Sequence, residues 1–181
     1  MFFLYNNPKK DMKISEEEKN HLEEIYQTFL HDEMVLKMKE VPMHRGSNCY
    51  LHSFLVAKRA IKNALRHKSV DLEAILLASI LHDYYLYDWR KDPSLKKKHG
   101  SRHPFIAALK AKADFEISEK VQRIIESHMW PINIRTFPNS LEARIVSIAD
   151  KYIASKEALT SKKYKNQKMD SLYKKIEHLF D

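Results

Sequence analysis

Six ionisable residues of the sequence stand at or beside positions where a helical core normally holds apolar side chains. They are His52, His82, Asp83, His103, His128 and Asp150. Taken singly, each has an ordinary explanation, such as a hydrogen-bonded core histidine or an exposed aspartate. Together they would require six separate buried partners, because an unpaired polar group in a core is costly. Imidazoles and carboxylates are good ligands for divalent first-row metals, so one or two shared ions would compensate all six.

The segments around these residues carry recognisable motifs. His52 lies in YLHSFLVAKRA, His82 and Asp83 end ILLASILHD, and Asp150 lies in SIADKY. In this order the three segments resemble the HD-domain metal-dependent phosphohydrolase superfamily, over about residues 44 to 158. The resemblance implies an all-helical bundle that holds divalent metal and activates water for attack on phosphorus.

His103 and His128 extend the similarity to the order H…HD…H…H…D, which resembles the HD proteins that hold two metal ions. The HP pair at 103–104 is similar to the corresponding histidine of the HD-GYP cyclic-dinucleotide phosphodiesterases. The resemblance implies one ion on His52, His82, Asp83 and Asp150, and a second on His103 and His128. Asp83 would bridge the two, and catalysis would depend on it. Fe, Mn, Zn, Ni and Mg are not distinguished by these ligands.

Two departures from the family pattern limit what is carried over. No segment matches the GYP motif, so cyclic di-GMP is not assumed as the substrate. The lysine that commonly follows the HD pair three positions on is replaced by Leu86. Proton delivery to the leaving group therefore needs another source.

Further polar and aromatic residues near the expected ligands are candidates for substrate binding. They are His44, His99, Arg102, Trp130 and Lys151. His44 and His99 could orient the ligands, contact substrate or do neither. Arg102 and Lys151 neighbour expected ligands and could hold a phosphate; the alternative is solvent-facing charge, which explains Lys151 equally well. Trp130 could stack on a ring, although aromatic residues more often belong to the core.

The elements that must position these residues are expected to be helices. The chain has only two glycines, which argues against a strand-and-turn architecture. Ser15 and Glu18 form a capping box that opens a helical segment reaching residue 40. Further helices are expected over 50–66, 71–83, 104–112, 118–130 and 140–159, with an irregular stretch over 84–102. His103 and Pro104 are expected to start their helix, because proline suits the first turn.

The predicted fold class is therefore all-α, a single-domain bundle of about seven helices. The expected organisation is an N-terminal helix over residues 1–40 that packs on the core, a metal-binding helical domain over 41–160, and a basic connector with a C-terminal helix over 161–181.

Composition narrows the partners and the compartment. The formal charge of +8 favours anionic partners, here a small phosphorylated substrate, with nucleic acid as the less favoured choice. No apolar run reaches the ~20 residues that span a bilayer, and no signal peptide is expected, so we predict a cytoplasmic protein without a membrane partner. Cys49 is the only cysteine, which agrees with a reducing compartment. The oligomeric state is left open.

Three functions remain open at this point. The leading one is a phosphohydrolase acting on a phosphomonoester or phosphodiester, including a nucleotide. The second is a di-iron oxygenase, because the myo-inositol and organophosphonate oxygenases of the same superfamily have a similar ligand order. The third is a non-catalytic nucleotide- or RNA-binding module, which the net charge and the basic C-terminal segment suggest.

Overall fold

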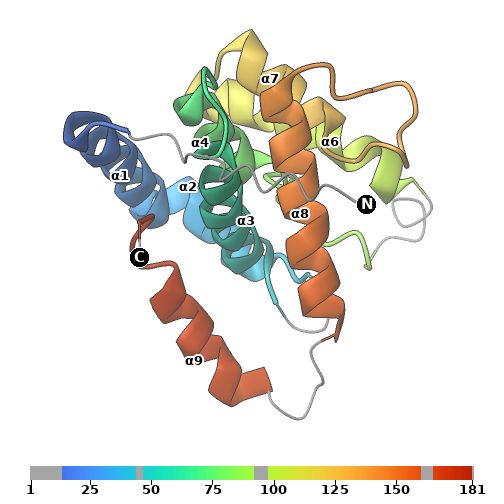
Figure 1. Ribbon diagram of the computed structural model, residues 1–181. Helices are drawn as coiled ribbons and strands as arrows, with labels where there is room; N and C mark the ends of the chain where they lie inside the picture. Colours follow the sequence, from blue (N-terminus) through green and yellow to red (C-terminus); the bar gives the residue numbers. More distant parts are fainter. Residues whose placement is uncertain (1–13, 44–46, 92–97, 160–164, 181) are drawn as a thin grey trace, which may run out of the picture.

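The computed structural model describes residues 14–43, 47–91, 98–159 and 165–180, and its regular elements there are all helical (Figure 1). The elements are α1 (Glu16–His31), α2 (Glu33–Leu36), the 3-10 helix η1 (Lys37–Glu40), α3 (Cys49–Ala64), α4 (Leu72–Leu81), α6 (His99–Phe115), α7 (Glu119–Ser127), α8 (Leu141–Leu159) and α9 (Lys165–Lys175). An isolated β-bridge joins Pro42 and Asn48. The predicted all-α bundle is confirmed.

The N-terminal segment folds as three short pieces rather than one helix to residue 40. Ser15 caps α1 as predicted, since its Oγ accepts a hydrogen bond from the Glu18 amide at 3.0 Å. The helix then ends at His31, because Asp32 adopts an extended conformation. The Asp32 carboxylate caps α2 by accepting from the Met34 amide at 2.8 Å and the Val35 amide at 2.9 Å. The expectation of one continuous helix was therefore wrong, since a strong N-cap restarts the chain.

The core is built around α4, which packs against α1, α3, α6, α7 and α8. Eight of its ten residues are buried, as its apolar composition predicts. Asn48 caps α3 by accepting from the Leu51 amide, and Asp71 caps α4 by accepting from the Ala74 amide, both at 2.9 Å. These caps fix where α3 and α4 begin, and the two helices pack side by side with α8 (Figure 1).

The helix that carries His103 begins four residues earlier than predicted. It starts at His99, runs to Phe115, and contains Pro104 in its second turn. Proline there removes only one backbone donor, which would otherwise reach the Gly100 carbonyl. The preceding turn is closed by bonds from the Ser101 and Arg102 amides to the Lys98 carbonyl at 3.2 and 3.0 Å. His99 and His103 therefore lie one turn apart on the same helix.

The next two helices, α7 and α8, begin close to their predicted starts at residues 118 and 140. Ser118 caps α7 and accepts from the Val121 amide at 3.3 Å, while the Ser140 hydroxyl accepts from the Ala143 amide at 3.1 Å at the start of α8. Helix α7 ends at Ser127, so His128 lies in the turn that follows it rather than inside the helix.

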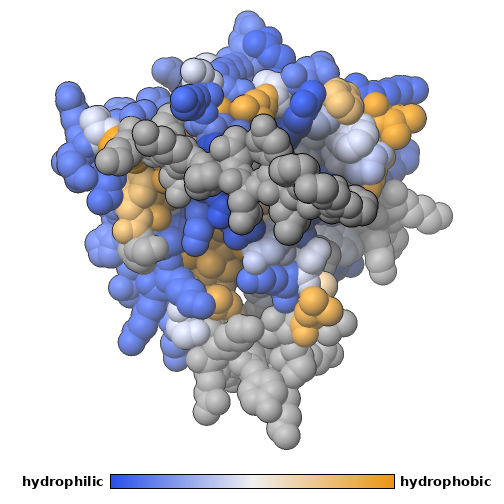
Figure 2. Space-filling model, in the orientation of Figure 1, coloured by the Kyte–Doolittle hydropathy of each residue, from blue (hydrophilic) through white to orange (hydrophobic). Residues whose placement is uncertain are grey.

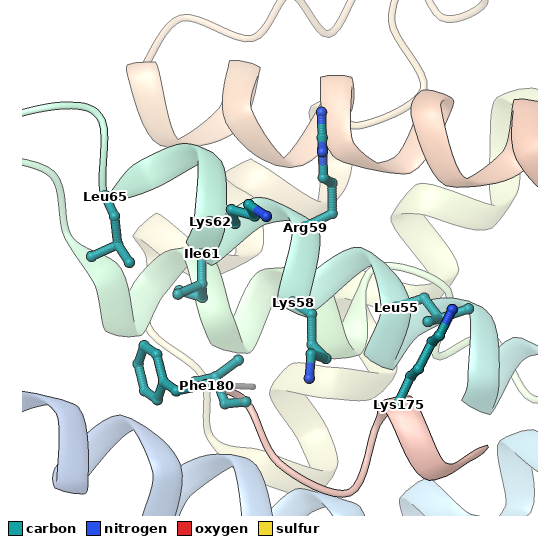
Figure 3. Close-up of a pocket in the computed structure, with 9 residues that line it drawn as sticks. Leu55, Lys58, Arg59, Ile61, Lys62, Leu65, Lys175 and Phe180 are labelled. Atoms are coloured by element: carbon teal, nitrogen blue, oxygen red, sulfur yellow. The ribbon is translucent and has the colours of Figure 1, made fainter. Parts of the chain in front are cut away.

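The C-terminal segment is tied to the bundle through α9, where the Tyr173 hydroxyl accepts from the Asn48 side-chain amide at 2.9 Å, and through the residues after it. The Tyr26 hydroxyl donates to the Ile176 carbonyl at 2.9 Å, and Ile176 and Leu179 are buried. A groove of about 640 Å³ lies between α3 and this segment (Figure 3). It is lined by Leu55, Lys58, Arg59, Ile61, Lys62, Leu65, Lys175, Leu179 and Phe180.

The outer surface is mostly hydrophilic in the view of Figure 2, with scattered apolar patches. None of the helices in the described ranges combines the length and the apolar character that a membrane span needs.

Candidate metal centre

Five separate parts of the chain bring the six predicted residues together. His52 comes from α3, His82 and Asp83 from the end of α4, His103 from α6, His128 from the turn after α7, and Asp150 from α8. All six are buried, and Asp150 is the most exposed at 8%. Residues 98 positions apart in sequence thus share one small polar cluster inside an apolar core.

Asp83 lies at the middle of the cluster, with one carboxylate oxygen toward each half. Its Oδ1 lies 3.2 Å from the Nε2 of His103 and 3.8 Å from that of His128. Its Oδ2 lies 3.4 Å from the Nε2 of His82 and 4.0 Å from that of His52. Asp83 is therefore arranged as a bridging carboxylate would be.

Asp150 completes the half that contains His52 and His82. Its Oδ1 lies 3.1 Å from the Nε2 of His52 and 3.7 Å from that of His82. Three groups of three have their ligand atoms within 4.8 Å of one another: His52, His82 and Asp83; His82, His128 and Asp150; and Asp83, His103 and His128. These spacings suit shared cations, since two-metal sites hold their ions about 4 Å apart.

Hydrogen bonds outside the cluster fix which nitrogen of each imidazole faces inward. The Nδ1 atoms of His82, His103 and His128 lie 2.8, 2.9 and 2.7 Å from the backbone carbonyls of Ser79, His99 and Ile125. Because a carbonyl only accepts, each Nδ1 must carry the proton. When such a ring is neutral, the lone pair of its Nε2 faces the cluster, which is the arrangement that metal-binding histidines adopt.

Several polar atoms of the cluster need a cation. The Nε2 atoms of His103 and His128 lie 3.0 Å apart, so two neutral rings would set lone pair against lone pair. No hydrogen bond reaches the buried His82 Nε2 or Asp83 Oδ1. A proton or a metal ion between these atoms would remove both problems. The donor set, four imidazoles and two carboxylates, fits a divalent metal.

The electrostatics of the cluster without metal agree with this need. Burial by itself lowers the pKa of His52, but hydrogen bonds to Asp150 and Glu157 outweigh it and raise the pKa to about 9. Burial would also raise the pKa of Asp83, but His82 and His103 hold it well below its usual range. Burial and the neighbouring histidines lower the pKa of His128 to about 3, so it stays neutral. Protons thus occupy positions where a metal would bind.

Glu157 is part of the site although the sequence did not single it out. Its Oε2 lies 2.9 Å from the Nδ1 of His52, and its Oε1 accepts from the Ser47 hydroxyl at 2.9 Å. It accepts the Nδ1 proton of His52, as the three backbone carbonyls accept the Nδ1 protons of the other three histidines. The available signal was its position seven residues after Asp150, two turns along the same face of α8.

A cavity of about 410 Å³ opens onto the cluster. It is lined by Met43, Asp83, Tyr85, Trp89, His99, Gly100, His103, His128, Met129, Ile132, Asp150, Lys151 and Ala154. Two of the predicted substrate residues, His99 and Lys151, therefore line it. Arg102 is exposed and Trp130 packs edge-on against Phe137 with ring centroids 5.3 Å apart, and neither is among the described lining residues. His44 lies outside the described residues.

His99 joins the candidate ligands to the cavity wall through stacked rings. Its ring centroid lies 4.6 Å from that of His103 and 4.9 Å from that of Trp89, with planes 21° and 19° from parallel. Its Nδ1 lies 3.1 Å from the Tyr87 hydroxyl. These contacts hold His99 and Trp89 as a wall beside the cluster.

Lys151 brings a positive charge to the lining of the cavity. Its ammonium donates to the His128 carbonyl at 2.9 Å and to the Ser147 hydroxyl at 2.7 Å, although much of the side chain is exposed. Burial of the ammonium end lowers the pKa of Lys151, and this outweighs the nearby charge of Asp150, which acts to raise it.

Comparison with known families agrees with the motif order. The HD domain family matches residues 49–155, well over half of the chain. No curated protein and no solved structure matches the chain. The matched range contains all six clustered histidines and aspartates, and the family together with this intact cluster suggests a metal-dependent hydrolase. The chain belongs to the HD domain family.

Proposed function

We propose that the protein is a metal-dependent phosphohydrolase that cleaves a small phosphomonoester or phosphodiester, nucleotides included, in the cavity above the cluster. The observation that carries the proposal is the common orientation of the buried donors. Four imidazoles turn Nε2 inward, and Asp83 directs one oxygen to each half. Nothing in an ordinary apolar core requires this arrangement.

The distances support a two-ion assignment. His52, His82, Asp83 and Asp150 would hold one ion, and His103, His128 and the second oxygen of Asp83 would hold the other. Bound there, divalent ions would supply a water of lowered pKa and neutralise charge on the phosphoryl oxygens.

The chain's own groups account for the remaining chemistry. Lys151 lies on the cavity wall, and its ammonium would exchange one of its three hydrogen bonds to His128 and Ser147 for a phosphoryl oxygen of the substrate. Because the pKa of Lys151 is lowered, it is also suited to donate a proton to the leaving oxygen. Lys151 would thereby take the role of the family's lysine, whose position Leu86 occupies in this chain. Met43, Met129 and Ile132 line the cavity and make part of its wall apolar.

The test is phosphate release by anaerobically purified protein. The protein is supplied with Mn²⁺, Fe²⁺, Mg²⁺, Zn²⁺ or Ni²⁺ in turn and screened against phosphate mono- and diesters. We expect metal-dependent phosphate release that is lost in Asp83→Ala and kept in Asp170→Ala, whose aspartate is exposed on α9. Dioxygen consumption that depends on an organic substrate, without phosphate release, would favour an oxygenase instead.

A further inference from the structure

The cavity wall beyond the candidate ligands is mostly apolar. Met43, Trp89, Met129, Ile132 and Ala154 line it. Among the described lining residues outside the cluster, Lys151 is the only one with a charged side chain. No serine, threonine, asparagine or glutamine occurs among the lining residues that the structure describes.

Of the other side chains of the described wall that can form hydrogen bonds, Trp89 offers only its indole N–H, and Tyr85 and His99 already have partners. The Tyr85 hydroxyl accepts a hydrogen bond from the Cys49 thiol at 3.2 Å and donates one to the Met43 sulfur at 3.5 Å. Tyr85 is also fully buried. His99 is held by the Tyr87 hydroxyl and by the rings on either side of it. The described wall therefore offers few hydrogen bonds to a polar organic group.

We infer that the preferred substrate is a phosphate monoester of an apolar alcohol or phenol, rather than of a hydroxyl-rich sugar. This inference rests on the proposed phosphohydrolase function. The phosphate lies at the cluster and Lys151, and the organic group contacts the apolar wall. A volume of about 410 Å³ suits a small molecule, since ligand sites usually enclose about 300–1,000 Å³. An aromatic ring suits this wall well, because the Met43 and Met129 sulfurs make favourable contacts with aromatic groups.

The reaction consumes one water for each ester. Its oxygen forms a new bond to phosphorus, the bond from phosphorus to the ester oxygen breaks, and inorganic phosphate and the alcohol result. The leaving oxygen takes its proton from the Lys151 ammonium, which regains one from the attacking water through solvent. A sugar as the leaving alcohol would give up hydrogen bonds to water for apolar contacts, which disfavours its binding in this cavity.

The test compares esters that share one leaving-group chemistry. Benzyl phosphate, glucose 6-phosphate and adenosine 5′-monophosphate are all esters of primary alcohols, so their intrinsic reactivities are similar. We expect kcat/KM of the metal-loaded protein to be at least about tenfold higher for benzyl phosphate than for glucose 6-phosphate. Trp89→Ala should reduce this ratio, whereas Phe105→Ala, which removes an exposed ring from α6, should leave it unchanged.

A binding measurement makes the inference independent of turnover. Calorimetry should give tighter binding of benzylphosphonate than of the 6-phosphonate analogue of glucose, neither of which has an ester bond to hydrolyse, and Trp89→Ala should reduce that difference. Equal binding of the two, or preferred hydrolysis of the sugar or nucleoside ester, would overturn the inference and leave the phosphohydrolase proposal intact. Failure of metal-loaded protein to hydrolyse any ester would instead overturn the proposed function.

Discussion

Replacing Glu157 tests whether the structure orients its metal ligands as described. The Glu157 carboxylate accepts the Nδ1 proton of His52 at 2.9 Å, which leaves Nε2 for the cluster. In Glu157→Gln the amide oxygen can still accept this proton, but the charge is lost. Hydrogen bonds to charged groups contribute about 1.5–3 kcal/mol and neutral ones about 0.5–1.5 kcal/mol. The difference of roughly 1.4 kcal/mol predicts about tenfold weaker metal binding. Glu157→Ala, which removes the acceptor, should cost about 10–100-fold.

The assay is titration of metal-free protein with Mn²⁺ or Zn²⁺ against a competing chelator. It should be run at pH 7 and pH 8.5, because Glu157 also helps to raise the pKa of His52 to about 9. Without Glu157 the pKa of His52 is lower, so fewer protons compete with the metal at pH 7, and this partly offsets the weaker binding. The loss of metal affinity should therefore be larger at pH 8.5. A purely structural defect would not produce this pH dependence.

Glu142→Gln is the matched control, since Glu142 lies on the same helix but pairs with Lys120 at 3.1 Å, outside the cluster. It should bind metal like the wild type. Binding by Glu157→Gln within about twofold of the wild type at both pH values would refute the positioning role of Glu157.

Three further predictions concern pH, proton transfer and the fold. In metal-free protein, His52 contributes stability that is complete below about pH 6.5 and lost as pH rises through about 9, because its folded pKa lies above its ordinary value. Thermal unfolding should therefore show the melting temperature falling over that range with chelator and falling less with bound metal; equal slopes would contradict this. Lys151→Met should lower kcat for esters of alkyl alcohols by about 10²–10⁴-fold and lower it less for 4-nitrophenyl phosphate, whose leaving group needs no proton; equal losses would exclude proton donation. Asp32→Ala should destabilise the fold by about 1 kcal/mol in urea unfolding, since it removes the cap of α2, and an unchanged midpoint would show that the cap is dispensable.

The sequence predicted the residues of the cluster because polar groups interrupted strongly apolar helices. Asp83 and Asp150 stand out against ILLASIL and RIVSIA in the printed chain. Their buried positions, and the convergence of both with the histidines, agree with that pattern. The sequence also placed the starts of two helices at residues 71 and 118, and in the structure Asp71 and Ser118 are the residues that cap them.

Other features had no comparable signal in the sequence. Glu157 lies in SKEAL, where a glutamate has the composition of an exposed helix face, and only the packing of α3 on α8 brings it to His52. The start of α6 was misplaced because Pro104 suggested a boundary, whereas its ring is accommodated inside the helix. The break at Asp32 was missed because apolar residues continue at helical spacing beyond it. Only the role of Glu157 depends on contacts between elements; the other two features come from local caps and turns that the apolar pattern does not reveal.

The central claim is that the clustered histidines and aspartates hold metal ions. Its most direct test is elemental analysis of anaerobically purified protein, together with metal titration of the metal-free form, for the wild type, Asp83→Ala and His103→Ala. Circular dichroism verifies that each variant keeps its helicity. We predict about two ions for each wild-type chain, about one for His103→Ala and none for Asp83→Ala. A folded Asp83→Ala variant with the metal content of the wild type would contradict the account.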